Sequence, residues 1–247
     1  MSHSNILYIH SHDTGRYVQP YGHAVPTPNI QRLAEEGVLF RQAFCVAPQC
    51  SPSRAGLLTG QWAHSSGMIG LAHRGFVLHD YGQHLVHTLR EAGYRSALIG
   101  VQHVAPDPAL IGYDEVVDVE SYRAEHVAPA AVDWLRSAPQ PFFLSVGFSE
   151  THREFPEPGP AEDPRYCLPP HPLPDTPATR RDMAAFKASA RLLDGGIGAV
   201  VEALGANSLA TNTLVNCTTD HGNAFPGLKC NQTDHCLGVM LIVRGPG

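Results

Sequence analysis

The residues best suited to chemistry in this 247-residue chain lie in the segment Cys-Ser-Pro-Ser-Arg at 50–54. Pro52 fits the first turn of a helix, where its missing N–H group is not needed, and Gly60 can end that helix. We therefore expect Cys50 at a helix N-terminus, where free N–H groups and the helix dipole favour an anion. Arg54 follows on the same helix face, and its planar guanidinium suits an oxyanion. The spacing predicts a nucleophilic sulfur beside an anion-binding group.

Four short apolar runs are typical of buried strands, and each is followed closely by polar residues. Stretches with helical spacing alternate with them, so we expect an α/β fold with a mainly parallel sheet sandwiched by helices. Parallel strands end on one edge, where open sheets of this kind bind ligands. The runs and polar residues are 5–9 with His12 and Asp13, 94–100 with His103, 142–148 with His152, and 213–219 with Asp220 and His221.

The other elements follow from start and stop signals. We expect Thr27 to cap a helix that stops at Gly37. Apolar runs predict single strands at 38–44 and 237–243, and the proline-rich span 153–178 predicts a long surface segment. Further helices are expected at 83–92, 124–138 and 180–204.

Composition excludes several classes of protein. A formal charge of -6 without basic clusters argues against a nucleic-acid partner. No apolar run approaches the roughly 20 residues of a membrane span. A strand begins so soon after Met1 that no signal peptide fits before it, and we expect a cytoplasmic protein. The six cysteines form no CxxC pair, and most are expected to be reduced thiols.

His12, Asp13, Asp220 and His221 should meet at the ligand-binding edge of the sheet and form a cation site. Oxygen ligands suit Ca²⁺ or Mg²⁺, whereas imidazole suits softer divalent metals. A cation beside Cys50 would attract an anionic oxygen and make the atom that carries it more electrophilic.

The spacing Cys-x-Pro-x-Arg at 50–54, followed by Leu-Thr-Gly at 58–60, resembles the sulfatase signature. In that family the cysteine is oxidised to formylglycine, an aldehyde whose hydrate attacks the sulfur of a sulfate ester. The resemblance implies an alkaline-phosphatase-like fold in which residues 1–247 are the N-terminal catalytic α/β domain, with the C-terminal subdomain absent. The stretches 67–71 and 99–104 look most similar to the sulfamidase, or N-sulfoglucosamine sulfohydrolase-like, branch.

The resemblance also implies roles for individual residues. Arg54 would hold sulfate oxygens, and His103 would be the base that helps to release sulfate. His152 would donate a proton to the leaving group, and Lys229 would bind the sulfate and the leaving oxygen.

Two positions depart from the family pattern. His12 stands where a carboxylate is usual, and this change favours Mn²⁺ or Zn²⁺ over the family's common Ca²⁺. Val101 stands where lysine is usual, so either Gln102 or another group compensates, or the activity is lower or altered.

The function implied is hydrolysis of a small sulfate ester or sulfamate, such as a sulfated sugar, after a formylglycine-generating maturation enzyme has converted Cys50. Two alternatives stay open at this point. One is a phosphate or phosphonate ester hydrolase of the same superfamily, and the other is a non-catalytic fragment or binding module.

Overall fold

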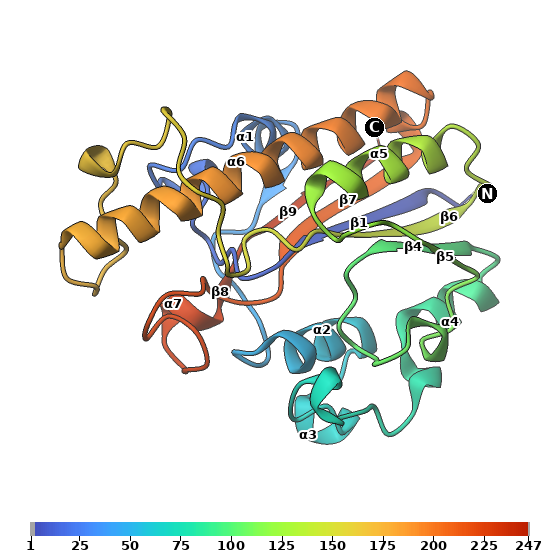
Figure 1. The fold of residues 1–247 in the computed structure, drawn as a ribbon. Coiled ribbons are helices and arrows are strands. Elements are labelled where there is room, and N and C mark those ends of the chain that lie inside the picture. The colour runs from blue at the N-terminus through green and yellow to red at the C-terminus, as the bar shows by residue number, and fades with distance from the viewer. Residues whose placement is uncertain (1–2, 247) are drawn as a thin grey trace.

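A seven-stranded sheet runs through the middle of the protein (Figure 1). The computed structural model describes residues 3–246. The strands are β1 (Asn5–Ser11), β2 (Val38–Leu39), β3 (Ala43–Phe44), β4 (Arg95–Gly100), β5 (Glu115–Val117), β6 (Phe142–Gly147), β7 (Thr213–Thr219), β8 (Gly238–Val239) and β9 (Leu241–Arg244). The order in the large sheet is β2-β9-β7-β1-β6-β4-β5, and only the pairings of β9 with β7 and β2 are antiparallel. The predicted mainly parallel α/β fold is therefore confirmed.

Helices cover both faces of this sheet. They are α1 (Pro28–Glu35), α2 (Cys50–Thr59), α3 (Ala63–Ser66), α4 (Leu85–Glu91), α5 (Ala124–Leu135), α6 (Pro177–Ala206) and α7 (Asp234–Leu237). In Figure 1, α1, α5 and α6 lie above the sheet, and α2, α3 and α4 lie below it. Alternate residues of β1 serve the two faces, because Leu7 and Ile9 pack in the cluster that includes α5 and α6, and Tyr8 packs with α2.

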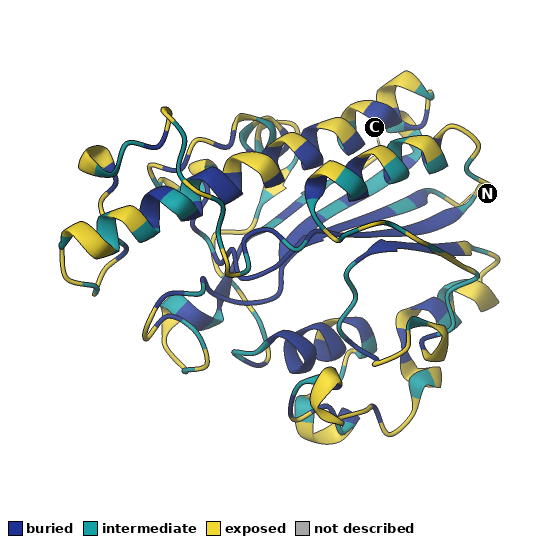
Figure 2. Cartoon of the chain, viewed as in Figure 1, coloured by how far each residue is buried: buried dark blue, intermediate teal, exposed yellow. Residues whose placement is uncertain are grey.

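The burial pattern follows these layers. Figure 2 shows the central strands dark blue and the outer helix faces yellow. All six residues of β6 are buried, as expected for a strand covered on both faces. None of the described helices is both long enough and apolar enough to cross a bilayer. All six cysteines are free in the structure, with no disulfide among them.

The two strands predicted at 38–44 and 237–243 are each divided in the structure. β2 pairs with β9 in the large sheet, whereas β3 pairs with β8 in a separate two-stranded sheet. The chain changes sheets at Met240, whose N–H donates to the carbonyl of Gly15 instead of to a neighbouring strand. The two segments divide together because they pair with each other, a tertiary constraint that hydrophobic runs do not encode.

Thr27 does not cap α1 as predicted. Its hydroxyl instead accepts from the N–H of Gln19, and the first N–H groups of the helix find another acceptor. The buried Asp194 of α6 accepts from the N–H of Ile30 at 2.9 Å and from that of Asn29 at 3.2 Å. A carboxylate from a distant helix therefore satisfies the free donors of α1, as a side-chain cap would.

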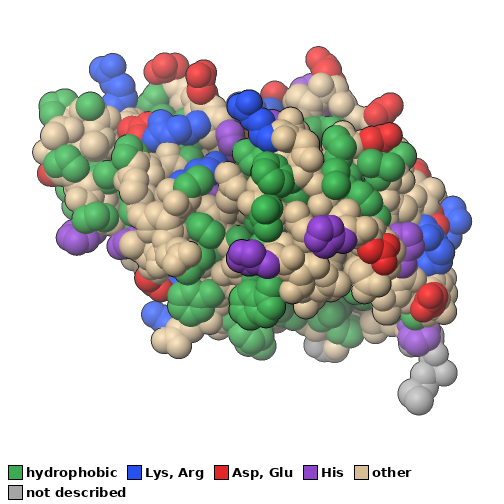
Figure 3. Space-filling model, turned by 90° about the horizontal axis from the view of Figure 1, so that it is seen from below, with side chains coloured by type: hydrophobic (Ala, Val, Ile, Leu, Met, Phe, Trp, Pro, Cys, Tyr) green, Lys and Arg blue, Asp and Glu red, His purple; other side chains and the backbone are tan. Residues whose placement is uncertain are grey.

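The lower face in Figure 1 carries exposed apolar side chains. Figure 3 looks directly onto this face and shows hydrophobic side chains interspersed with histidines. Exposed residues of this part of the chain include Leu57, Trp62 and Ile69. The segment after Gly60 folds into α3 and two short 3₁₀ helices, Ala72–Arg74 and Tyr81–Gln83.

Replacing Asp194 with alanine should lower the free energy of unfolding by about 1–3 kcal/mol, because two N–H donors of α1, one of them buried, lose their acceptor. Urea unfolding followed by circular dichroism measures this change. The matched control is Asp133→Ala, at a solvent-exposed carboxylate of α5 paired only with Arg136, and it should change stability by less than about 0.5 kcal/mol. Equal effects from both substitutions would show that Asp194 does not act as the cap.

Candidate active site

The polar residues that follow four strands lie at one edge of the sheet. The strands β7, β1, β6 and β4 are adjacent and parallel, so their C-terminal ends face the same way. Asp13 and Asp220 follow two neighbours in this set, and a backbone-to-carboxylate hydrogen bond of 2.8 Å joins them. The predicted gathering of strand ends is confirmed.

Cys50 is the first residue of α2, as the sequence predicted, and only 3% of it is exposed. Its Sγ lies 3.3 Å from His221 Nε2 and 3.9 Å from His12 Nδ1. Burial, together with the charges of Asp220 and Asp13, raises the pKa of this thiol well above its ordinary value. The stabilisation of an anion by the helix terminus is thus outweighed, and the unmodified side chain is a neutral thiol at pH 7.

The four residues predicted to bind a cation lie together. His12 Nδ1 is 3.0 Å from Asp13 Oδ1 and 3.2 Å from Asp220 Oδ2. Donor atoms of His12, Asp13, Asp220 and Cys50 all lie within 4.8 Å of one another. This donor set, with two buried carboxylates at its centre, has the chemistry of a divalent cation site.

The ring of His221 gives an independent test of that fit. Its Nδ1 is 2.8 Å from the carbonyl oxygen of Gly222, which can only accept, so Nδ1 carries a proton. Its Nε2 lies 3.1 Å from Asp13 Oδ1, and in a neutral ring these two atoms are both acceptors. A cation between the two atoms would remove this repulsion. The arrangement therefore suits a bound cation.

Two basic side chains balance the two carboxylates. Arg54 Nη2 lies 3.0 Å from Asp220 Oδ2, and Lys229 Nζ lies 2.6 Å from Asp13 Oδ2. Burial alone would raise the pKa of Asp220, but the charges of His221 and Arg54 hold it well below its ordinary value. Burial also tends to raise the pKa of Asp13, but the hydrogen bond from His12 outweighs this effect, and the pKa lies below its ordinary value. Both groups are therefore carboxylates at neutral pH.

Arg54 is nearly fully buried, and its guanidinium is held by protein groups. Besides Asp220, it donates to the carbonyl oxygen of Ser11 at 2.9 Å and contacts His10 Nδ1. The structure thus shows Arg54 positioning a carboxylate of the candidate cation site. Its contact with a sulfate oxygen stays a prediction.

His103 and His152 flank a cavity of about 390 Å³ beside His12. His103 adopts a left-handed backbone with φ of 58°, and its Nε2 lies 2.9 Å from His73 Nδ1. Burial, with the neighbouring His12 and Arg54, lowers the pKa of His103 to about 3, so its ring is neutral. His152 is half-exposed, and its Nε2 lies 4.0 Å from Asp13 Oδ2.

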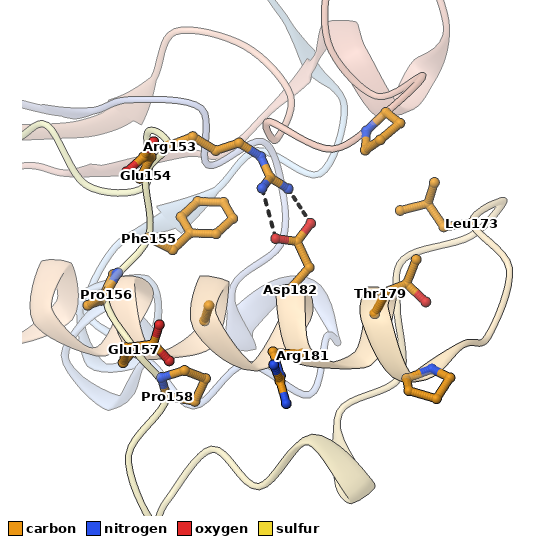
Figure 4. A pocket seen from close by; sticks show the side chains of 14 residues that line it. Arg153, Glu154, Phe155, Pro156, Glu157, Pro158, Leu173, Thr179, Arg181 and Asp182 are labelled. Atoms are coloured by element: carbon orange, nitrogen blue, oxygen red, sulfur yellow. Dashed lines mark hydrogen bonds and ion pairs between the residues drawn. The ribbon is translucent and has the colours of Figure 1, made fainter.

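A second cavity, of about 470 Å³, opens on the other side of His152 and is lined by Asp13 and Lys229. Arg153 and Asp182 border both this cavity and a larger one of about 710 Å³. Figure 4 shows Arg153 reaching across to Asp182 at the edge of the larger cavity, with an Nη1–Oδ1 distance of 2.8 Å. The candidate site is therefore open towards the proline-rich segment predicted at the surface.

Sequence reasoning missed His10 and His73, and of the alternatives left open for position 101 the structure argues against Gln102. Side chains along a strand alternate between its two faces, so His10 lies on the same face as Tyr8 and His12, towards α2. This alternation is a sequence signal that could have identified His10. No sequence signal joins His73 to His103, because only the fold of the segment after α3 brings them together.

The Gln102 side chain bonds the backbone of Val104 and Ala105, so it is not free to replace the lysine missing at 101.

The fold and the site define an α/β protein with a cysteine at a helix start beside a candidate cation site. The sulfatase family model matches residues 4–247, and the chain belongs to the sulfatase family. It is 32% identical to human N-sulphoglucosamine sulphohydrolase over 98% of its length. That alignment covers 55% of the human protein, so the chain spans about half the length of this relative.

Two solved structures share the fold at low sequence identity. A Bacteroides fragilis protein classed as a sulfatase matches with a TM-score of 0.82 and 21% identity, over 99% of this chain and 68% of that one. A phosphonate monoester hydrolase of Agrobacterium radiobacter matches with a TM-score of 0.79 and 20% identity, over the same shares of the two chains. These matches confirm the alkaline-phosphatase-like fold, which sulfate and phosphonate chemistry both use.

The unconverted thiol of Cys50 should react slowly with iodoacetamide in the folded, chelator-treated protein. Its raised pKa lowers the thiolate fraction about tenfold per pKa unit, and burial limits access. Peptide mass mapping over time should show Cys50 alkylated at least about tenfold more slowly than the exposed Cys230. The two rates should converge in denaturant. Equal rates in the folded protein would contradict the buried, neutral thiol.

Proposed function

We propose that this chain carries the catalytic centre of a hydrolase for sulfate esters or sulfamates. The observation that carries the proposal is the convergence of Cys50, at the start of α2, with two buried carboxylates and two basic groups at one sheet edge. A divalent cation bound there would leave the site with surplus positive charge, because Arg54 and Lys229 already balance Asp13 and Asp220. An anionic sulfate group offsets that surplus.

The residues present fit the two groups on which this chemistry depends. His12, Asp13, Asp220 and His221 would hold the cation, with Ca²⁺ the family's common choice and Mn²⁺ or Zn²⁺ favoured by His12. When bound, the cation polarises the sulfate and makes its sulfur more electrophilic. Formylglycine at position 50, when formed, supplies the nucleophilic hydrated aldehyde. Cys50 is buried in the folded chain, so a formylglycine-generating enzyme would have to reach it before folding is complete.

The surrounding side chains supply orientation and proton transfer. Arg54 holds Asp220 in place through their buried ion pair. Lys229 Nζ lies beside Asp13 and is partly exposed, so a sulfate oxygen can approach it. His103, whose ring lies close to position 50 and whose Nδ1 has no hydrogen-bond partner among the described residues, would be the base there. His152 lies between two cavities at the mouth of the site, where it can donate a proton to a departing alcohol or amine.

The substrate we propose is a sulfated sugar, supported by the human relative's name, which specifies N-sulphoglucosamine. The cavities on both sides of His152 provide space for a sugar larger than the sulfate group. Phosphonate ester hydrolysis is the second candidate, because an enzyme of that activity shares the fold.

Protein co-expressed with a formylglycine-generating enzyme should have an intact mass lower by the difference between CH₂SH and CHO. It should hydrolyse an aryl sulfate or N-sulphoglucosamine faster than an aryl phosphonate. Cys50→Ala should lower turnover by roughly 10³-fold or more, because the nucleophile is lost. Mass spectrometry measures the mass change, and steady-state kinetics on the three substrates measures the substrate preference and the loss of turnover.

The matched control is Cys167→Ala, which removes a sulfur from the apolar cluster that includes residues of α6 and should leave turnover unchanged. Preference for the phosphonate would replace the sulfatase assignment with the second candidate. Full conversion of Cys50 without turnover of any ester would indicate a non-catalytic chain.

His12→Asp should shift metal preference towards Ca²⁺, by roughly tenfold or more, because a nitrogen donor is exchanged for an anionic oxygen. Isothermal titration with Ca²⁺, Mn²⁺ and Zn²⁺ measures this shift. The titrations should use a Cys50→Ala background, so that the thiol does not contribute a ligand. His64→Asp, at an exposed histidine, is the control. An unchanged preference in His12→Asp would show that His12 is not a ligand.

A further inference from the structure

Cys50 also belongs to a group of soft metal donors. A ring nitrogen of His12, a ring nitrogen of His103 and the Cys50 sulfur all lie within 4.8 Å of one another. The sulfur and His12 Nδ1 are 3.9 Å apart, close to the separation of two ligands on one tetrahedral metal ion. Two imidazoles and a thiolate form a ligand set that suits Zn²⁺, whereas Ca²⁺ prefers oxygen alone.

His103 is arranged as a metal ligand would be. Its Nε2 is engaged by His73 Nδ1 at 2.9 Å, and the two rings stack. Its Nδ1 is buried and has no hydrogen-bond partner among the residues that the structure describes. A metal-binding histidine commonly uses one nitrogen for such an outer contact, which fixes the ring and leaves a lone pair on the other nitrogen. The unpartnered Nδ1 therefore has a ligand's chemistry.

The three donors are held by separate rigid elements. His12 follows β1, Cys50 opens α2, and His103 follows β4 in a left-handed backbone conformation. A positive φ at a non-glycine residue is strained and persists where the surroundings impose it. The donors are thus brought together by the folded protein.

We propose that, while residue 50 is still a cysteine, Cys50, His12 and His103 bind a soft divalent cation, with Zn²⁺ as the best match. Binding forms a sulfur–metal bond and releases the thiol proton to solvent, with no change in oxidation state. A carboxylate of Asp13 or Asp220, from the group that already includes His12 and Cys50, completes four ligands. Conversion of residue 50 to an aldehyde removes the sulfur donor. Only this last step rests on the proposed function.

Cobalt titration of the unconverted, chelator-treated protein tests the inference. A thiolate-to-cobalt charge-transfer band should appear with one Co²⁺ per chain and disappear in Cys50→Ser. Zn²⁺ should displace Co²⁺ stoichiometrically. His103→Ala should weaken Zn²⁺ binding by at least about 100-fold, and His73→Ala by about 10–100-fold, because His73 only orients a ligand.

Two controls sharpen the test. Cys230→Ser removes the exposed thiol, the most accessible site for adventitious cobalt, and should keep the band. His103→Ala and His73→Ala should leave Ca²⁺ affinity unchanged, because Ca²⁺ prefers oxygen ligands and neither histidine side chain supplies one. The proposal is overturned if the band survives in Cys50→Ser, or if His103→Ala binds Zn²⁺ as tightly as the parent. Either result leaves the sulfatase assay on converted protein unaffected, so the two proposals fail separately.

Discussion

The buried contact between Arg54 and Asp220 is the interaction on which the rest of the site depends. Nη2 and Oδ2 lie 3.0 Å apart, and neither side chain is more than a few per cent exposed. The same carboxylate accepts from the backbone N–H groups of Asp13 and His221. Removing one partner of a buried ion pair typically costs about 3–5 kcal/mol, because the other charge is left unpaired. This contact therefore joins α2 to the ends of β1 and β7, and in doing so it places Cys50.

Charge balance explains why the site takes the form that it does. Two buried carboxylates without compensation would protonate; His221 and Arg54 lower the pKa of Asp220, and the hydrogen bond from His12 lowers that of Asp13. Arg54 and Lys229 lie against the two carboxylates as counter-charges. The same balance means that an added divalent cation creates an excess of positive charge. An anionic ligand is then favoured at the mouth of the site, where Lys229 is partly exposed.

His12 connects two kinds of ligand chemistry in one place. Its Nδ1 lies between two carboxylate oxygens, and the same side chain belongs to the group with Cys50 and His103. A carboxylate at this position would make the site more uniformly oxygen-based. With a histidine, the hard oxygen donors of Asp13 and Asp220 and the soft nitrogen and sulfur donors of His12 and Cys50 belong to one group.

The sequence by itself determined the local features: a helix starting at Cys50, strands ending before Asp13, His103, His152 and Asp220, and a mainly parallel sheet. These features follow from short-range signals, such as a proline in a first helical turn and polar residues after apolar runs. The roles of individual site residues stay predictions, although the structure brings the predicted residues together.

Only the tertiary structure decided how distant segments satisfy each other. Asp194 caps α1 in place of Thr27, and His73 contacts His103 across a loop. The strands predicted at 38–44 and 237–243 divide because they pair with each other in two sheets. The thiol of Cys50 is neutral because burial outweighs the helix terminus. Pairing and burial are properties of surroundings that the folded chain assembles, and no local pattern of residues encodes them.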